Sequence, residues 1–215
     1  GAALGTIQNQ LAALKRMFRL GMEAGKVAQR PVFPTLEIRN TRQGFFEAAQ
    51  CQALLGHLPE ALRPFVTFLS LTGWRTGEAR TLQWRQVDFE AGTIRLEPGT
   101  TKNDEGRLFP FRAFPALEDV LREQWQRSQD LARRTETIVP WVFHRQGAPI
   151  GDFRKAWATA CVAAGTPGRM PHDFRRTAVR NLERAGVPRS VAMKLTGHKT
   201  ESVYRRYAIV SESDL

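Results

Sequence analysis

The chain of 215 residues has little cysteine: Cys51 and Cys161 are far apart and have no cluster of metal-ligand residues near them. This scarcity argues against a disulfide framework and against a zinc site, so both cysteines are expected to be buried thiols. No apolar run approaches the roughly 20 residues that a membrane-spanning helix needs, and the first residues lack a secretion signal. We therefore expect no membrane partner and a cytoplasmic location.

Two further patterns are missing. The sequence offers no clustered carboxylates for a divalent cation, and it contains no G-x-x-x-x-G-K phosphate loop for ATP. We therefore expect no metal and no other cofactor. Internal repeats and low-complexity segments are missing as well.

Positive charge is what the chain has in excess. It contains 32 Lys and Arg against 21 Asp and Glu, which gives a net charge of +11 at pH 7. Such an excess indicates a polyanionic partner, with nucleic acid first and an acidic membrane second. The hydrophobic share of 42% and the charged share of 25% are ordinary for a globular protein, which excludes disordered and fibrous classes.

The first part of the chain predicts one helix and a linker. Apolar residues recur at helical spacing from Ile7 to Gly25, and Pro31 and Pro34 then disfavour helix up to about Arg42. A domain boundary is expected between residues 41 and 42. Because the chain starts without Met and enters the helical pattern almost at once, residues 1–41 are expected to be the end of a larger, truncated domain.

Residues 42–215 predict an α+β domain that is mainly helical and contains a small antiparallel sheet. Residues 93–96 and 107–111 have strand patterns, and the polar loop between them contains Lys102. Helical patterns cover residues 44–56, 59–71, 76–84, 115–132, 151–164, 173–185, 188–195 and 201–208.

Three segments carry side chains suited to a phosphodiester. In TGWRTGE, Arg75 stands at a predicted helix start, where a guanidinium and free backbone amides suit a phosphate, and Glu78 lies on the same face to hold it. In HDFRRT, His172 and Arg175 share one helical face. Each motif alone is weak, because a surface ion pair or a helix cap explains it equally well.

The third segment is TGHK, in which His198 follows a helix-ending glycine and stands nine residues before Tyr207. With this segment the three motifs appear in a fixed order. Residues 42 to about 210 thereby resemble the catalytic domain of tyrosine site-specific recombinases, the phage integrase family. The ordered set is far more specific than any one of its motifs.

The resemblance implies a bacterial or phage-encoded enzyme that cuts and rejoins double-stranded DNA through a 3′-phosphotyrosyl intermediate. It also implies a homo-tetramer on two DNA sites, a monomeric state for this fragment, and a core-binding-domain origin for residues 1–41. The implied catalytic residues are Arg75, Lys102, His172, Arg175, His198 and the nucleophile Tyr207, with Glu78 in support.

The sequence departs from the family pattern at two positions near these motifs. Thr196 stands where Leu is common before Gly-His, and Phe174 stands where Leu is usual between the His and the Arg. Only eight residues follow Tyr207, so a tail contact with a neighbouring subunit is expected to be incomplete.

The chemistry explains why a tyrosine needs this set. At pH 7 about one free phenol in a thousand is ionised, so the phenol proton needs an acceptor. The resemblance makes His172 the candidate base, and the phosphate itself is the alternative acceptor. The two arginines would stabilise charge on the phosphate, and His198 would add a hydrogen bond to it. Lys102 would protonate the departing 5′ oxygen.

Alternatives remain open at this point. Tyr204, three residues before Tyr207, is a rival nucleophile, although core packing explains it too. A type IB topoisomerase would use the same chemistry to rejoin the original strand. Residues 187–207 also resemble a helix-turn-helix of a non-enzymatic DNA-binding protein. Packing is expected for the tryptophans and a surface position for the remaining histidines, namely Trp74, Trp84, Trp125, Trp141, Trp157, His57 and His144.

Overall fold

The computed structural model describes residues 3–36, 44–99 and 106–208. Lys102 lies outside the described residues. The chain divides into two compact units, Gly1–Arg42 and Gln43–Leu215, which places the division one residue beyond the expected boundary.

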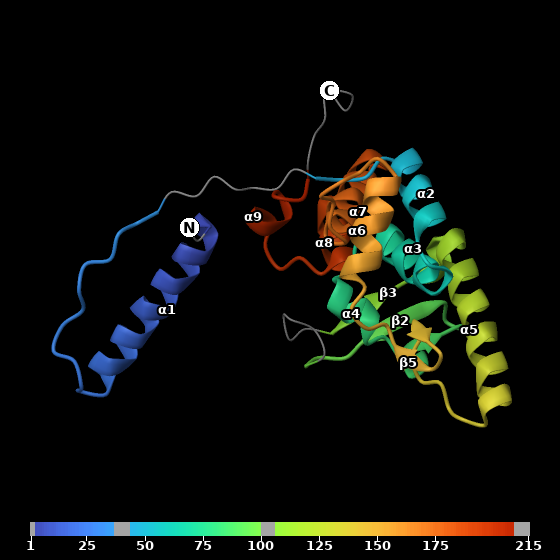
Figure 1. Cartoon of the computed structure of the whole chain (residues 1–215), viewed down its shortest axis with the longest axis horizontal. Coiled ribbons are helices and arrows are strands. Elements are labelled where there is room, and N and C mark those ends of the chain that lie inside the picture. The colour runs from blue at the N-terminus through green and yellow to red at the C-terminus, as the bar shows by residue number, and fades with distance from the viewer. Residues whose placement is uncertain (1–2, 37–43, 100–105, 209–215) are drawn as a thin grey trace. The chain divides into compact units, whose positions relative to one another are not determined.

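The first unit contains one long helix, α1 (Leu4–Glu23), followed by irregular residues up to 36 (Figure 1). None of the residues of α1 is buried. The ring of Phe18 meets that of Phe33 edge-on, with 5.6 Å between the ring centroids. The apolar stripe that predicted this helix therefore stays largely uncovered within its own unit.

The second unit is mainly helical, as predicted. Its helices are α2 (Ala48–His57), α3 (Arg63–Thr72), α4 (Thr76–Arg80), α5 (Pro115–Thr135), α6 (Arg154–Ala163), α7 (Asp173–Arg184), α8 (Arg189–Thr196) and α9 (Glu201–Tyr204). Single turns of 3₁₀ helix occur at Glu60–Leu62 (η1), Trp84–Gln86 (η2) and Phe111–Ala113 (η3). A prediction of helix throughout 59–71 missed the break before α3, where Pro64 in the first turn begins a new helix.

The sheet is small and antiparallel, which agrees with the predicted fold class. Its strands pair in the order β1 (Val87–Asp88), β2 (Thr93–Leu96) and β3 (Arg107–Phe109), and β4 (His144–Arg145) with β5 (Ala148–Pro149) forms a separate hairpin. Leu96 pairs with Arg107, so Arg107, the first residue of β3, lies across from the last residue of β2. The predicted strand 107–111 ends at Phe109 because Pro110 has no amide hydrogen for the ladder.

Helix α3 lies at the centre of the second unit and packs against α7 and α5 (Figure 1). Its buried side chains include Phe65 and Phe68, whose rings meet the ring of Phe143 at 5.6 and 5.1 Å. Trp74, just after the helix, stands edge-on to Phe68 at 5.2 Å. This aromatic core fixes the segment that leads into Arg75.

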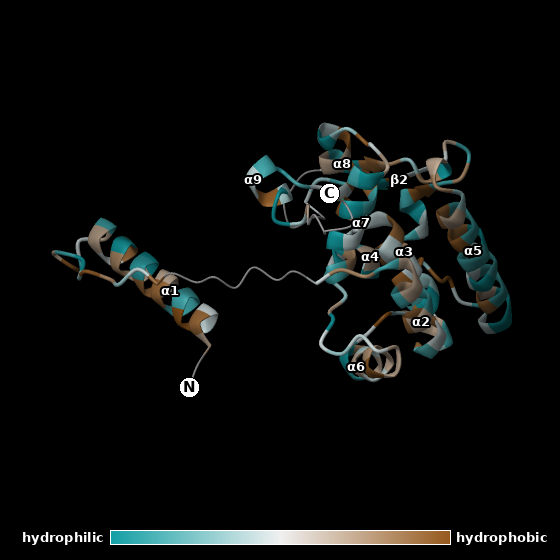
Figure 2. Cartoon of the chain, turned by 90° about the horizontal axis from the view of Figure 1, so that it is seen from above, coloured by the Kyte–Doolittle hydropathy of each residue, from teal (hydrophilic) through white to brown (hydrophobic). Residues whose placement is uncertain are grey.

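Helix α7 is strongly hydrophilic and nevertheless buried. All eight residues from Asp173 to Arg180 are buried, including three arginines. In Figure 2 much of this helix is teal although it lies within the bundle. Because a buried charge is costly unless it is paired and hydrogen-bonded, the surroundings of α7 must supply its partners.

The structure corrects the expectation that His144 lies at the surface. His144 is partly buried, and its Nε2 lies 3.1 Å from Ser128 Oγ. The Ser128 hydroxyl donates to the carbonyl of Gln124 and accepts from Trp84 Nε1, so it faces His144 with a lone pair. His144 therefore has a structural role in packing. Of the two thiols expected to be buried, Cys161 is buried and Cys51 is only partly so.

Within the described parts of the chain, no helix combines the length and the apolar character that crossing a membrane would require.

Gly73 provides a test of how α3 is joined to α7. It ends α3 with φ +64°, and a Cβ atom there would lie 2.7 Å from the Cβ of Ala178. We expect Gly73→Ala to lower the free energy of unfolding by about 2–4 kcal/mol, through left-handed strain and overpacking. Urea unfolding measures this.

The matched control is Gly56→Ala, because Gly56 lies within α2 and a Cβ atom there would meet nothing within 4 Å. This variant should be unchanged or more stable by up to about 1 kcal/mol. Equal losses in both variants would contradict the packing described for Gly73.

Candidate active site

Tyr207 lies three residues beyond α9 and faces the start of α7. Its hydroxyl oxygen is 2.9 Å from Nε2 of His172, and the two rings meet edge-on at 5.5 Å. His172 directly precedes α7 and makes no side-chain cap bond with the helix. With the ring hydrogen on Nδ1, His172 accepts the hydrogen of the Tyr207 hydroxyl.

Arg175 presents a buried guanidinium in the middle of the site. Its Nε donates to His198 Nε2 at 3.1 Å, and its Nη1 donates to the carbonyl oxygen of Gly73 at 2.9 Å. The third nitrogen, Nη2, is buried and has no hydrogen-bond partner among the described residues. Burial, and then the charge of Arg75, lower the pKa of Arg175 to about 10, so the group remains charged at neutral pH. Nη2 is therefore a cationic donor suited to an anion.

His198 is engaged at both ring nitrogens. Nε2 accepts from Arg175, and Nδ1 lies 2.7 Å from the hydroxyl oxygen of Thr196. The expected hydrogen bond from His198 to a phosphate is thus not available in this arrangement. Instead, His198 holds Arg175.

Arg75 precedes α4, and its guanidinium Nη1 pairs with Glu78 Oε1 at 2.7 Å. The backbone amide of Arg75 donates to the other oxygen of the same carboxylate at 3.3 Å. Helix α4 has only five residues, and this amide is already occupied. The phosphate-binding helix start expected here stays a prediction, and Arg75 offers its side chain.

Arg107 is a site residue that sequence reasoning missed. Its Nη2 pairs with Glu78 Oε2 at 2.8 Å, and its guanidinium carbon lies 4.4 Å from the ring centroid of Trp74. The guanidinium also lies so close to Gly197 that a Cβ atom there would collide with it. A signal was available, because Arg107 is two residues before the buried Phe109 and alternate strand residues share a face.

Arg176 is the second residue that was missed. Its guanidinium carbon lies 5.3 Å from the ring centroid of Tyr207, and that of Arg175 lies 5.5 Å from it. Nη1 of Arg176 pairs with Asp173 at 3.1 Å. The ring of Tyr207 is thus accompanied by two guanidinium groups from consecutive residues of α7.

Burial and positive charge keep both histidines of the site neutral. The pKa of His172 is lowered, first by burial and then by the charges of Arg175 and Arg176. The pKa of His198 is lowered to about 3 by burial and then by Arg175, Arg75 and Arg107. Because neutral imidazole has a free lone pair, His172 is able to accept a proton near pH 7.

Tyr204 occupies a different environment from Tyr207. Its side chain is fully buried in a small cluster with Val179 and Ala192, and its ring stands edge-on to that of His198 at 5.3 Å. Burial raises the pKa of Tyr204 to about 12. Both features count against Tyr204 as a nucleophile and favour the packing interpretation.

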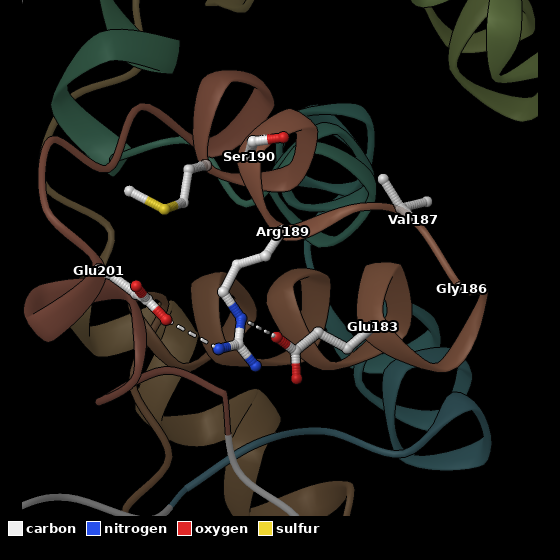
Figure 3. A pocket seen from close by; sticks show the side chains of 7 residues that line it. Glu183, Gly186, Val187, Arg189, Ser190 and Glu201 are labelled. Atoms are coloured by element: carbon white, nitrogen blue, oxygen red, sulfur yellow. Dashed lines mark hydrogen bonds and ion pairs between the residues drawn. The ribbon is translucent and has the colours of Figure 1, made fainter.

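Two salt bridges of Arg189 connect α8 with α7 and α9. Figure 3 shows Arg189 between Glu183 and Glu201, with nitrogen–oxygen distances of 3.2 and 3.0 Å. Exposed pairs of this kind are worth at most about 1 kcal/mol each, so Tyr204 is the stronger anchor of α9. These salt bridges border a hollow of about 590 Å³. None of the candidate active-site residues lines it; its lining residues are Glu183, Gly186, Val187, Arg189, Ser190, Met193 and Glu201.

The geometry speaks against a helix-turn-helix in residues 187–207. The second helix, α9, has only four residues and ends at the buried Tyr204. A recognition helix has to run along a groove for several turns, and four residues make about one turn. Helix α9 instead carries the anchor that brings Tyr207 to His172.

The structure thus brings together Arg75, Glu78, His172, Arg175, His198 and Tyr207, which come from three separate stretches of the chain. Lys102 is the one predicted site residue that lies outside the described residues. Within the described ranges, no three His, Cys, Asp or Glu side chains are grouped so that they could hold a metal ion.

Residues 45–213 match the phage integrase family, and the chain therefore belongs to that family. The integrase of Salmonella phage P22 is 25% identical over 229 residues, which cover 100% of this chain and 56% of the relative. The tyrosine recombinase XerC of Lactobacillus leichmannii is 26% identical, and the alignment covers 99% of this chain and 75% of XerC.

Solved structures agree on the fold. The Tn1549 transposon integrase in complex with transposon right end DNA has a TM-score of 0.76 at 18% identity, covering 100% of this chain and 78% of the other. A lambda integrase dimer bound to a COC′ core site has a TM-score of 0.67 at 18% identity, covering 93% and 57%. The chain spans 56% and 58% of the length of the P22 integrase and of the prophage integrase IntR of Escherichia coli.

The lowered pKa of His198 makes the stability of the protein pH-dependent. In the unfolded chain His198 takes up a proton near pH 6.5, whereas in the folded protein it does so near 3. Its contribution to folding is therefore complete above pH 6.5 and is lost as the pH falls toward 3. Relative to His198→Gln, the wild type should lose about 2 kcal/mol more between pH 7 and pH 5 in urea unfolding. Equal losses would show that His198 is not held neutral.

The buried contact between Arg107 and Glu78 provides a second test. Only 8% of the Arg107 side chain and 4% of the Glu78 side chain are exposed. Arg107→Met should lower the free energy of unfolding by about 3 kcal/mol at pH 7, because it leaves a buried carboxylate with Arg75 alone. Adding Glu78→Gln should recover part of that loss, since the unpaired charge is then removed. Arg95→Met, an exposed residue on the neighbouring strand, is the control.

Proposed function

We propose that the chain cuts and rejoins DNA as a site-specific recombinase, with Tyr207 as the nucleophile and a 3′-phosphotyrosyl intermediate. One observation carries the proposal: the Tyr207 hydroxyl lies 2.9 Å from Nε2 of a neutral His172. Membership of the phage integrase family supports the same reaction.

His172 provides the base that the phenol needs. Near pH 7 the hydroxyl of a free tyrosine is almost entirely protonated. As the phenol oxygen forms its bond to phosphorus, its proton passes to Nε2 of His172, and the bond between phosphorus and the 5′ oxygen breaks. The cut strand then ends in a phosphotyrosine ester.

The arginines stabilise the charge that builds on the phosphate during the attack. Nη2 of Arg175 supplies a buried cationic donor, and Arg75, partly exposed beside it, supplies a second. Removal of one such fixed donor costs roughly 3–4 kcal/mol of transition-state stabilisation. Glu78 pairs with Arg75, and Arg107 holds the other oxygen of the same carboxylate.

The leaving group must be protonated as it departs. Lys102, which lies outside the described residues, is assigned this role by the family resemblance. It would give its proton to the 5′ oxygen, which leaves as a hydroxyl. Because the ester retains the energy of the broken bond, a 5′ hydroxyl from another strand can attack it and release Tyr207 without ATP.

The partner in this proposal is double-stranded DNA, held mainly through its phosphates, so binding should weaken steeply with salt. The Tn1549 integrase and lambda integrase structures, both containing DNA, support this choice. Residues 1–41 would be the end of a core-binding domain. Strand exchange would require a homo-tetramer on two DNA sites, and the kinship supports a bacterial or phage-encoded protein that acts in the cytoplasm.

Covalent capture tests the proposal on DNA of randomised sequence, so no particular site has to be chosen. The probe is a library of duplexes with one fixed nick and randomised sequence on both sides, incubated with the chain in EDTA. Cleavage near the nick releases a short fragment with the 5′ hydroxyl, so the protein–DNA adduct is trapped. We expect an adduct band on a denaturing gel for the wild type and for Tyr204→Phe, and none for Tyr207→Phe.

An adduct that survives Tyr207→Phe and disappears in Tyr204→Phe would contradict the assignment of the nucleophile. The captured sequence then separates the two candidate enzymes. A recombinase joins two copies of it, whereas a type IB topoisomerase relaxes supercoiled DNA and rejoins the original strand.

A further inference from the structure

Thr196 is a buried polar residue beside the site. It is the last residue of α8, two positions before His198, and its side chain is fully buried. A hydroxyl buried in an apolar place costs free energy unless it is hydrogen-bonded, and its partners therefore matter.

The hydrogen of the Thr196 hydroxyl has one possible acceptor on its own helix. Oγ1 lies 2.7 Å from the carbonyl oxygen of Ala192 and 2.7 Å from Nδ1 of His198. A hydroxyl donates one hydrogen and accepts with its lone pairs, and a carbonyl oxygen accepts only. If the hydrogen goes to Ala192, the hydroxyl faces His198 with a lone pair, and Nδ1 must carry a hydrogen.

The other side of the His198 ring imposes the same form. Nε of Arg175 lies 3.1 Å from Nε2, and a guanidinium only donates, so Nε2 must be bare. The opposite tautomer would place two hydrogens face to face between His198 and Arg175. Thr196 and Arg175 thus select the same neutral imidazole, with its hydrogen on Nδ1.

We propose that Thr196 is a positioning residue: its hydroxyl fixes the tautomer of His198 and thereby the orientation of Arg175 toward the phosphate. The inference rests on the proposed function, because the phosphate is the ligand of that reaction. Arg175 is held by His198 through Nε and by Gly73 through Nη1, which leaves Nη2 for the substrate. Without the Thr196 contact, Nδ1–H of His198 would lose its acceptor, and the ring would lose one of the two hydrogen bonds that hold it against Arg175.

The imidazole of His198 also touches the nucleophile. Its ring centroid lies 4.7 Å from that of Tyr207, with an interplanar angle of 53°. A rotation of the His198 ring in search of a new partner for Nδ1 would therefore disturb Tyr207 as well as Arg175. The hydroxyl of Thr196 stabilises both contacts at once.

Nitrogen NMR tests the contact itself, since ¹⁵N shifts distinguish a protonated from a bare ring nitrogen. The signals of His198 are those missing in His198→Gln. We expect Nδ1 protonated and Nε2 bare in the wild type and in Thr196→Ser, and a larger share of the Nε2–H form in Thr196→Val. A packing role alone predicts the reverse order of damage, because Val keeps the shape of Thr and Ser does not.

The capture rate on a trapping duplex tests the consequence for catalysis. Thr196→Val should lower the rate by about 10- to 100-fold, the effect of one buried hydrogen bond left unmade, and Thr196→Ser should retain most of it. The matched control is Thr67→Val, which removes a similar bond to the carbonyl four residues earlier, at 2.9 Å, and should leave the rate unchanged.

Protonated Nε2 in the wild type would overturn the proposal. So would a Thr196→Val protein with unchanged tautomer and unchanged capture rate, and the proposed function would then still stand if Tyr207→Phe abolishes capture. If the wild type captures no duplex at all, the proposed function fails, and the NMR comparison still decides whether Thr196 sets the state of His198. If Thr196→Val does not fold, the wild-type and Thr196→Ser spectra decide.

Discussion

The buried guanidinium of Arg175 is the constraint on which the site depends. An arginine stays protonated even in the interior, so its charge has to be met by hydrogen bonds to fixed acceptors. The carbonyl of Gly73 provides one, and it is free to do so because left-handed Gly73 ends α3. The ring of His198 provides the other. These two hydrogen bonds of Arg175 therefore join the segment before Arg75 and the segment of His198 to α7.

The balance of charge around Arg175 explains why the two histidines of the site are neutral. Arg75, Arg107 and Arg175 stand near one carboxylate, Glu78, so positive charge exceeds negative charge in the site. The pKa values of both histidines are lowered in these surroundings, and a neutral imidazole is the form that a base requires. A bound phosphate would reduce this excess of positive charge, because the phosphate is negatively charged. A single arrangement thus favours an anionic ligand and keeps the base deprotonated.

Much of the fold could be predicted because it follows from local patterns. Strand 93–96 and the helix beginning near 173 were found within a residue or two, since alternation and helical spacing are written into the sequence. The ordered motifs likewise indicated most of the residues that meet in the site. Arg176 was missed because a buried arginine looks like a surface arginine until its tertiary partners are known, whereas the alternation of its strand did offer a signal for Arg107. The role of Thr196 was hidden for the same reason, since Arg175, on which it acts through His198, is 21 residues away in sequence.

The two tyrosines near the end of the described chain show how one short segment separates anchoring from chemistry. Tyr204 and Tyr207 are three residues apart, and a turn continues past the end of α9, since the amides of Tyr207 and Ala208 both donate to the carbonyl oxygen of Tyr204. Tyr204 enters the cluster with Val179 and Ala192, where burial disfavours its ionised form. Tyr207 remains partly exposed, with its hydroxyl on His172. Because the turn after α9 is hydrogen-bonded to the carbonyl oxygen of Tyr204, the buried ring of Tyr204 anchors the turn that holds the second tyrosine against a base.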